Sequence, residues 1–152
     1  GKETHFFDRN GTYLDKNNCI DIEWNSLRVA VRNQPNNFQN YRKDIRLRLE
    51  TATGNAGEWY KLPKVNPGPD FYVFTYTDGS CGKLLGWHLI NVRKLIRVIT
   101  DPDVLYKEIR SNNTLATDQT TAFRVLDVSI YPQIVCRSSM PDITAIAPLP
   151  QL

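Results

Sequence analysis

Apolar and charged residues alternate most regularly in the stretch KDIRLRLE, residues 43–50. Ile45, Leu47 and Leu49 occupy every second position, and charged residues fill the positions between them. This period of two predicts a β-strand with one buried face and one charged face. The stretch FYVFTYT at 71–77 is aromatic and β-branched throughout, and it predicts a second buried strand.

Shorter runs of the same kind predict further strands. Residues 19–32 predict one long strand, or two strands broken near Asn25 and Ser26. The other predicted strands lie at 58–62, at 84–90, where the strand pairs back on 71–77 as a hairpin, at 122–130 and at 133–136.

Helical spacing is confined to the region after residue 90. Apolar residues between 92 and 99 recur at helical intervals, and Asn91 before them is a favoured N-cap residue. Asp101 followed by Pro102 predicts the start of a second helix, which would run to about Arg110. The predicted fold class is therefore α+β, with a mostly antiparallel, β-rich sheet and one or two short helices.

The chain length of 152 residues fits one ordinary domain. We assign residues 1–140 to a single globular domain and residues 141–152, which contain three prolines, to an extended Pro-rich C-terminal tail. No apolar run reaches the roughly 20 residues of a membrane span, so we expect no membrane insertion.

Composition and charge are those of an ordinary globular protein: 41% of residues are hydrophobic, 23% are charged and the formal net charge is +3. This mild basicity permits a polyanionic partner without requiring one. The cysteines are far apart and form no CxxC or Cys/His cluster, which argues against a structural zinc site. They are most simply thiols of a reducing compartment, which favours an intracellular location, although one disulfide bridge is also compatible with them. These cysteines are Cys19, Cys81 and Cys136.

Acidic residues on two predicted strands are candidates for metal chemistry. Asp21 and Glu23 share one face of the first strand, and Asp44 and Glu50 share one face of the next. Carboxylates that converge from neighbouring strands can hold Mg²⁺ together with waters and substrate phosphate oxygens. We therefore predict Asp21 and Glu23 as metal ligands and Asp44 and Glu50 as catalytic acids. The alternative is a cross-strand ladder of salt bridges with nearby arginines.

Basic residues gather in two parts of the sequence. Cations that bind phosphates, with aromatic residues that stack on bases, would form a nucleic-acid surface, and the alternative is a solvated strand or helix face. The predicted nucleic-acid-binding residues are Arg28, Arg32, Lys43, Arg46 and Arg48. The second group, on the predicted late helices, contains Arg93, Lys94, Arg97, Lys107 and Arg110.

The stretches KDIRLRLET, PDFYVFTY, LLGWHLI and AFRVLDVSI occur in this order between residues 43 and 130. Their order resembles the restriction-endonuclease-like superfamily, which carries the PD-(D/E)xK active site. The first stretch is similar to the second catalytic strand of that superfamily, and the others are similar to the strands that follow. The resemblance implies a nuclease-like α+β core and, for an active member, a metal-dependent endonuclease.

The catalytic motif of that superfamily is not intact in this chain. Its members place an acidic residue and, two positions later, a lysine on one strand, where they coordinate metal and position water. The matching positions here hold Arg46 and Arg48, whose guanidinium groups neither ligate Mg²⁺ nor serve well as bases. The resemblance therefore implies a domain that binds without cutting, or one whose acids come from elsewhere, such as Asp21 and Glu23.

Two classes of function follow from these residues. The first is a nucleic-acid-interacting domain with a nuclease-like core, whose cofactor, if it cleaves, would be Mg²⁺. The alternative is a β-rich protein-interaction module without enzymatic activity, secreted or on a viral or pathogen surface, in which aromatic residues anchor a protein partner. A third interpretation, a small-ligand β-barrel, would place a pocket among Trp24, Trp59 and Trp87.

Overall fold

The computed structural model describes residues 4–6, 18–36, 43–50, 54–78, 82–112, 120–141 and 143. Within these ranges, six strands form one sheet, here called sheet A: β1 (Thr4–Phe6), β2 (Ile22–Trp24), β3 (Leu27–Asn36), β5 (Phe71–Asp78), β6 (Leu84–Asn91) and β9 (Val135–Ser138). Three strands form sheet B: β4 (Asp44–Arg48), β7 (Lys107–Asn112) and β8 (Thr120–Asp127). The described helices are α2 (Glu58–Lys61), α3 (Val92–Ile99) and the 3-10 helix η1 (Pro132–Ile134).

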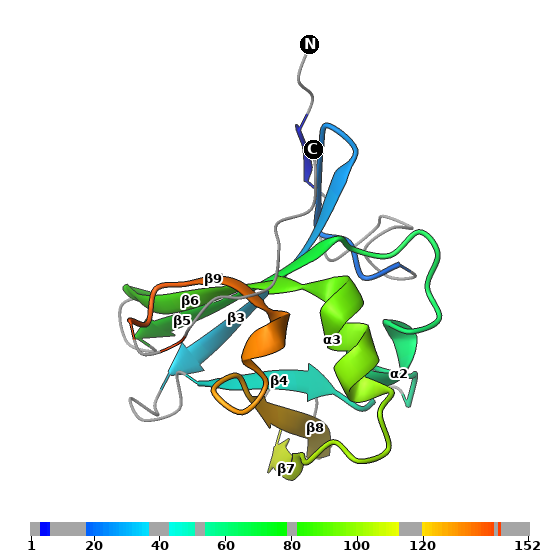
Figure 1. Ribbon diagram of the computed structural model, residues 1–152, viewed down its shortest axis with the longest axis vertical. Helices are drawn as coiled ribbons and strands as arrows, with labels where there is room; N and C mark the ends of the chain where they lie inside the picture. Colours follow the sequence, from blue (N-terminus) through cyan, green and yellow to red (C-terminus); the bar gives the residue numbers. More distant parts are fainter. Residues whose placement is uncertain are drawn as a thin grey trace.

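The two sheets form two layers, with sheet B and α3 over the same side of sheet A (Figure 1). Sheet A has the strand order β1-β2-β3-β5-β6-β9, and sheet B has the order β4-β8-β7. Every pair of neighbouring strands in this part of the chain is antiparallel except β3 and β5, which are parallel. The predicted α+β class with mostly antiparallel strands is therefore confirmed.

The break predicted near residue 25 is a tight hairpin turn between β2 and β3. Asn25 and Ser26 have positive φ angles of 48° and 65°, as the two central residues of a type I′ turn require. The hairpin of β5 and β6 is also confirmed. So is the helix start after β6, because the Asn91 Oδ1 atom accepts a hydrogen bond from the Lys94 amide at 3.1 Å.

Two predicted elements are wrong. Residues 58–62 form the helix α2 and its C-cap instead of a strand. Gly57 lies so close to the backbone of β4 that a Cβ atom would clash with the Arg48 carbonyl, and there the chain turns into the helix. The helix predicted from residue 101 is a turn followed by β7, because the Asp101 carboxylate accepts the Asp103 amide at 2.9 Å and closes a local turn.

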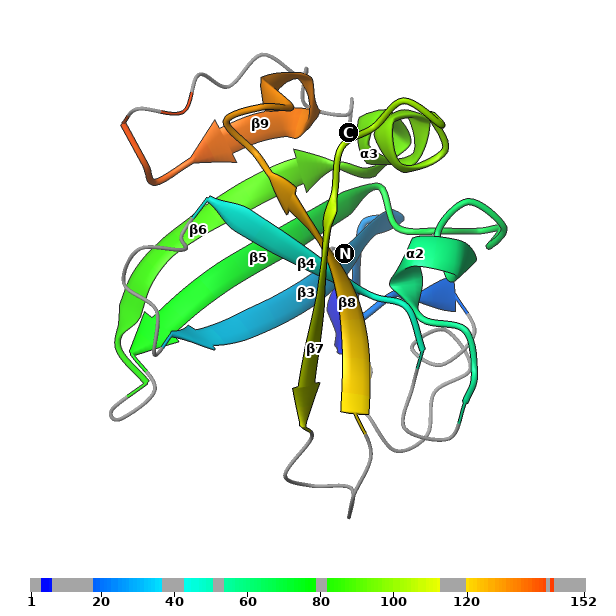
Figure 2. The same cartoon turned by 90° about the horizontal axis from the view of Figure 1, so that it is seen from below.

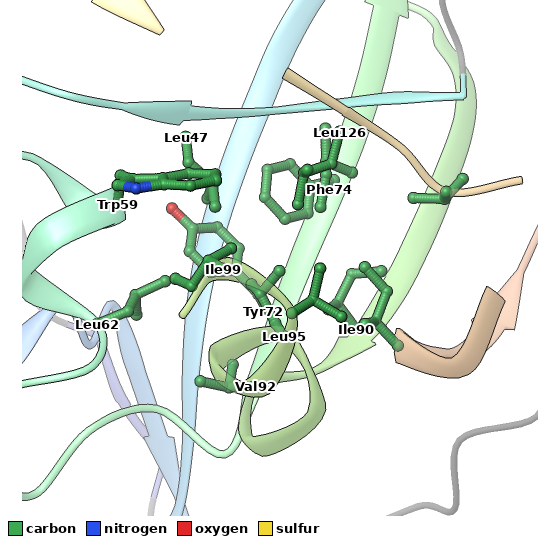
Figure 3. Close-up of a cluster of buried hydrophobic side chains, with 14 of the residues drawn as sticks. Leu47, Trp59, Leu62, Tyr72, Phe74, Ile90, Val92, Leu95, Ile99 and Leu126 are labelled. Atoms are coloured by element: carbon green, nitrogen blue, oxygen red, sulfur yellow. The ribbon is translucent and has the colours of Figure 1, made fainter. Parts of the chain in front are cut away.

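The hydrophobic core lies between the two sheets and α3 (Figure 3). Tyr72, Phe74 and Ile90 contribute from sheet A, and Leu47 and Leu126 contribute from sheet B. Figure 3 shows the side chains of α3 closing one side of this cluster, with the indole ring of Trp59 in α2 beside them.

The alternation that predicted β4 describes its burial well. Ile45 and Leu47 are 0% exposed and Leu49 is 7% exposed, whereas the charged residues between them are half-buried. Beyond residue 140, Ile143 is buried in the core, and the rest of the predicted tail lies outside the described residues except Pro141. Within the described ranges, no helix has the length and apolar character needed to cross a bilayer.

Candidate functional site

The edge strand β4 is fixed on both of its sides. One side pairs with β8 in the register of sheet B. On the other side, the side-chain amide of Gln34 in β3 accepts a hydrogen bond from the Arg46 backbone N–H at 3.1 Å and donates one to the Asp44 carbonyl at 3.0 Å. The Tyr76 hydroxyl of β5 donates to the same carbonyl at 2.7 Å. Side chains of sheet A therefore satisfy polar groups that an edge strand would otherwise expose.

Glu58 in α2 fixes the other end of β4. Its Oε2 atom accepts the Arg48 backbone N–H at 3.0 Å. Its Oε1 atom forms an ion pair with Arg32 and accepts a weaker hydrogen bond from the Tyr72 hydroxyl at 3.5 Å. Burial raises the pKa of Tyr72, so this hydroxyl stays protonated as a donor. One carboxylate thus joins β3, β4 and β5 to α2.

The outer face of sheet B points away from the core, as Figure 2 shows with sheet B in front of sheet A. Its side chains form rows across the three strands, because Arg46 and Lys107 both pair with Val125, and Arg48 and Ile109 both pair with Phe123. We call this surface the basic sheet face, and its residues are Arg46, Arg48, Lys107, Ile109, Phe123 and Val125.

Apolar side chains lie between the cations of the basic sheet face. The Arg48 guanidinium carbon lies 5.8 Å from the centre of the Phe123 ring, within the range of a cation–π contact. Val125 is only 5% exposed although it is no part of the core cluster, which is consistent with long neighbouring side chains covering it. The face therefore combines charge with apolar surface.

One end of the same face is acidic. Asp44 pairs in register with Asp127. Burial, and then the neighbouring Asp127 carboxylate, raise the pKa of Asp44, while Arg46 and Lys107 lower it less. The Asp127 carboxylate accepts the backbone amide and the hydroxyl of Ser129 at 2.8 and 2.5 Å. These hydrogen bonds show that Asp127 also holds the turn that follows β8.

The predicted metal and catalytic acids do not form one group. Asp21 accepts a backbone N–H of β3 at 2.6 Å, and Glu23 lies on β2, so both belong to the region of sheet A. Asp44 begins β4 of sheet B, and Glu50 is exposed just beyond the end of that strand. Among the described residues, no three His, Cys, Asp or Glu side chains gather as a metal site would require.

The predicted basic residues separate into two environments. Arg28 pairs with Asp70. The Asp70 carboxylate accepts a hydrogen bond from the Arg28 backbone N–H at 2.9 Å and lies 3.6 Å from the Arg28 Nε atom. Arg32 lies on the side of sheet A that faces α2 and the core, where it forms an ion pair with Glu58 of α2. Lys43 directly precedes β4, where its carbonyl accepts the Val128 amide at 2.9 Å. The two arginines of β4 instead belong to the basic sheet face.

The second basic group also divides. Arg93 and Arg97 are exposed on α3. Lys107 and Arg110 lie on β7, and Arg110 pairs with Glu108 at 2.6 Å on the exposed surface. Lys107 is thus a member of the basic sheet face that the sequence did not assign to it, since the segment was expected to be helical.

The buried histidine of β6 has a structural environment. His88 is 0% exposed, its Nδ1 atom lies 2.9 Å from the Ser138 hydroxyl, and its ring meets the edge of Tyr76 at 5.4 Å. A fully buried imidazole in such contacts is poorly placed to act on a substrate. His88 is therefore a buried structural residue of β6.

Comparison with known proteins adds no relative. No protein-family model matches the chain, and neither the curated proteins nor the solved structures include a significant match. The resemblance to the PD-(D/E)xK superfamily stays a prediction from the sequence. The geometry of the basic sheet face is therefore the main basis for a functional proposal.

Proposed function

We propose that this chain binds nucleic acid through the basic sheet face. The observation that carries the proposal is the register of sheet B, which aligns Arg46 with Lys107 across Val125 and sets Arg48 beside Phe123. Guanidinium and ammonium groups bind phosphate oxygens through charge-assisted hydrogen bonds. The Phe123 ring, which lies beside Arg48, would contact sugars and bases.

The anchoring of β4 supports the same proposal. Its two arginines extend from a strand that is hydrogen-bonded to β8 on one side and to Gln34 and Glu58 on the other. A rigid backbone lowers the entropy lost when side chains are ordered on a ligand. This strand is therefore better suited to binding than a loop with the same charges.

Binding without cleavage is the form of the proposal that the residues favour. Arg46 and Arg48 occupy the positions where the resembled nucleases carry an acid and a lysine. Asp44 is the member of the predicted acidic set that begins a strand of this face, with Asp127 opposite it. If Mg²⁺ takes part, Asp44 is the residue through which we expect it to act.

The test is fluorescence anisotropy with a labelled oligonucleotide of about 15 nucleotides, single-stranded and duplex, between roughly 25 and 200 mM salt. Three cations on the face predict a slope of log affinity against log salt of about −2 for a single strand and nearly −3 for a duplex. Incubation with Mg²⁺, followed by gel analysis, tests cleavage in the same samples. Absence of binding at the lowest salt would contradict the proposal, because the phosphate attraction is strongest there.

One observation favours the alternative of a protein-interaction module. Trp24 and Val31 are 36% and 39% exposed, and strand alternation places both on the side of sheet A that faces away from sheet B. Exposed aromatic and aliphatic residues on one sheet face are typical of protein contacts. Light scattering of the wild type and of Val31→Glu tests whether this face joins two copies of the chain. The alternative gains support if self-association is seen and the variant abolishes it.

A further inference from the structure

Three aromatic side chains surround one arginine at the junction of α2, β7 and β8. The Arg124 guanidinium carbon lies 4.1 Å from the centre of the Tyr106 ring, 4.8 Å from that of Trp59 and 6.0 Å from that of Tyr60. The rings of Trp59 and Tyr106 are 5.5 Å apart and tilted. We call Trp59, Tyr60, Tyr106 and Arg124 the aromatic cluster.

The members of the aromatic cluster differ sharply in exposure. Trp59 is 7% exposed and belongs to the core, so it forms the base of the cluster. Tyr60 and Tyr106 are 44% and 46% exposed. The Nε atom of Arg124 is buried and has no hydrogen-bond partner among the described residues. Aromatic rings therefore surround this guanidinium group, and two of them remain open to solvent.

The segment that carries Tyr106 is held in place before β7 begins. The Tyr131 hydroxyl accepts the Leu105 amide at 2.7 Å and lies 3.1 Å from the Leu105 carbonyl oxygen. Both backbone polar groups of Leu105 are thus fixed by one side chain. Because Tyr106 is the next residue, its ring is presented from an ordered backbone, as a rigid stacking surface requires.

The aromatic cluster and the basic sheet face contain neighbouring residues of the same strands but lie on opposite sides of sheet B. Tyr106 directly precedes Lys107, and Arg124 directly follows Phe123, so each strand contributes neighbouring residues to both surfaces. Arg124 pairs in register with Leu47, whose side chain points into the core, so the cluster lies on the inner side of the sheet end. β7 is, like β4, an edge strand of sheet B, so its outer edge separates the two surfaces, and a chain that contacted both would pass around this edge.

We infer that the aromatic cluster is a base-stacking subsite and that the nucleic acid bound is single-stranded. This inference rests on the proposed function of the basic sheet face. A single strand can place an unstacked base on the exposed ring of Tyr106 or Tyr60, beside the Arg124 cation, while its phosphates contact Lys107 and the arginines of β4. In a duplex the base faces are covered by stacking and are not available to these rings.

The test compares ring removal with ring retention in the full chain. Tyr106→Ala and Tyr60→Ala are each expected to weaken binding of a single-stranded oligonucleotide by roughly five- to a hundredfold. Tyr106→Phe and Tyr60→Phe keep the ring and should bind like the wild type. The salt slope should be unchanged in all four variants, because no phosphate contact is removed. Leu84→Ala, which removes a 55% exposed apolar side chain of β6, is the matched control.

The outcomes separate this inference from the proposed function. If the wild type binds no oligonucleotide at low salt, the proposed function fails and the subsite fails with it. If the wild type binds but prefers duplex, or if both alanine variants fold and bind like the wild type, only the subsite is overturned. Tyr60→Ala keeps the test decisive should Tyr106→Ala fail to fold, because the Tyr60 ring is the more distant from Arg124.

Discussion

Arginines on β3 and β4 follow the same alternating sequence pattern but have opposite environments. On β3, Arg32 faces α2 and forms an ion pair with Glu58, with side chains that are 17% and 14% exposed. On β4, Arg46 and Arg48 extend from the outer face of sheet B beside Phe123 and Val125. The difference arises because sheet B and α2 cover one side of sheet A, whereas the outer side of sheet B carries the charges.

Arg32 is thus a cation that holds the fold, whereas Arg46 and Arg48 are half-buried cations on the outer face of sheet B. Removing one partner of a buried ion pair leaves an uncompensated charge and costs about 3–5 kcal/mol. Removing a charge from an exposed surface changes the free energy of unfolding by less than about 1 kcal/mol. Measurements of the free energy of unfolding therefore test the distinction between the two strands.

The largest effect is expected for Glu58→Ala. The variant leaves Arg32 buried without its carboxylate and removes the acceptor of the Arg48 amide. We expect the free energy of unfolding to fall by about 3 kcal/mol or more, measured by urea denaturation followed by tryptophan fluorescence. Glu108→Ala breaks the exposed pair with Arg110 and serves as the control, with an expected loss below about 1 kcal/mol. Equal losses in the two variants would show that burial does not distinguish these pairs.

A smaller effect is expected for Asp44→Asn, which tests the acidic end of the basic sheet face. Folding raises the pKa of Asp44 above its ordinary value of 3.8. In the pH interval between 3.8 and the folded pKa, the folded state therefore binds more protons than the unfolded state. The free energy of unfolding of the wild type should therefore fall as pH rises from 3.8 through the folded pKa. The variant lacks this part of the pH dependence.

Urea denaturation of both proteins across acidic and neutral pH measures the difference. The stability of Asp44→Asn relative to the wild type should increase through that interval and then stay constant. The gain should remain below about 1 kcal/mol, because the carboxyl group is only partly buried and solvent screens it. A relative stability that decreases with rising pH would contradict the assigned environment. The Tyr76 bond to the Asp44 carbonyl involves the backbone and should persist in the variant.

Local patterns were sufficient to predict the parts of the fold that depend on neighbouring residues. The alternation around Leu47, the turn at Asn25 and the cap at Asn91 are all properties of a few consecutive positions, and the structure confirms them. β7 was missed because Asp101 and Pro102 resemble a helix start, and only pairing with β8 makes the following segment a strand. Long-range pairing overrides such a local signal.

The candidate site was only partly predictable for the same reason. Arg46 and Arg48 were found because they alternate with the buried apolar residues Ile45 and Leu47 on one strand. Lys107 could be added only from the register between β7 and β8. The pairing of Arg32 with Glu58 depends on where α2 packs, and residues 26 positions apart carry no local signal of contact. The acids on β2 and β4 could not be placed relative to each other before the two sheets were known.

The most direct test of the basic sheet face compares two variants that each remove two positive charges. Arg46→Gln with Arg48→Gln changes the basic sheet face, and Arg93→Gln with Arg97→Gln changes exposed positions on α3. Anisotropy with a single-stranded oligonucleotide should show at least tenfold weaker binding for the β4 variant, with a salt slope that is smaller by about 1.4. The α3 variant should keep the wild-type slope. Equal losses in the two variants, or unchanged binding by the β4 variant, would contradict the account.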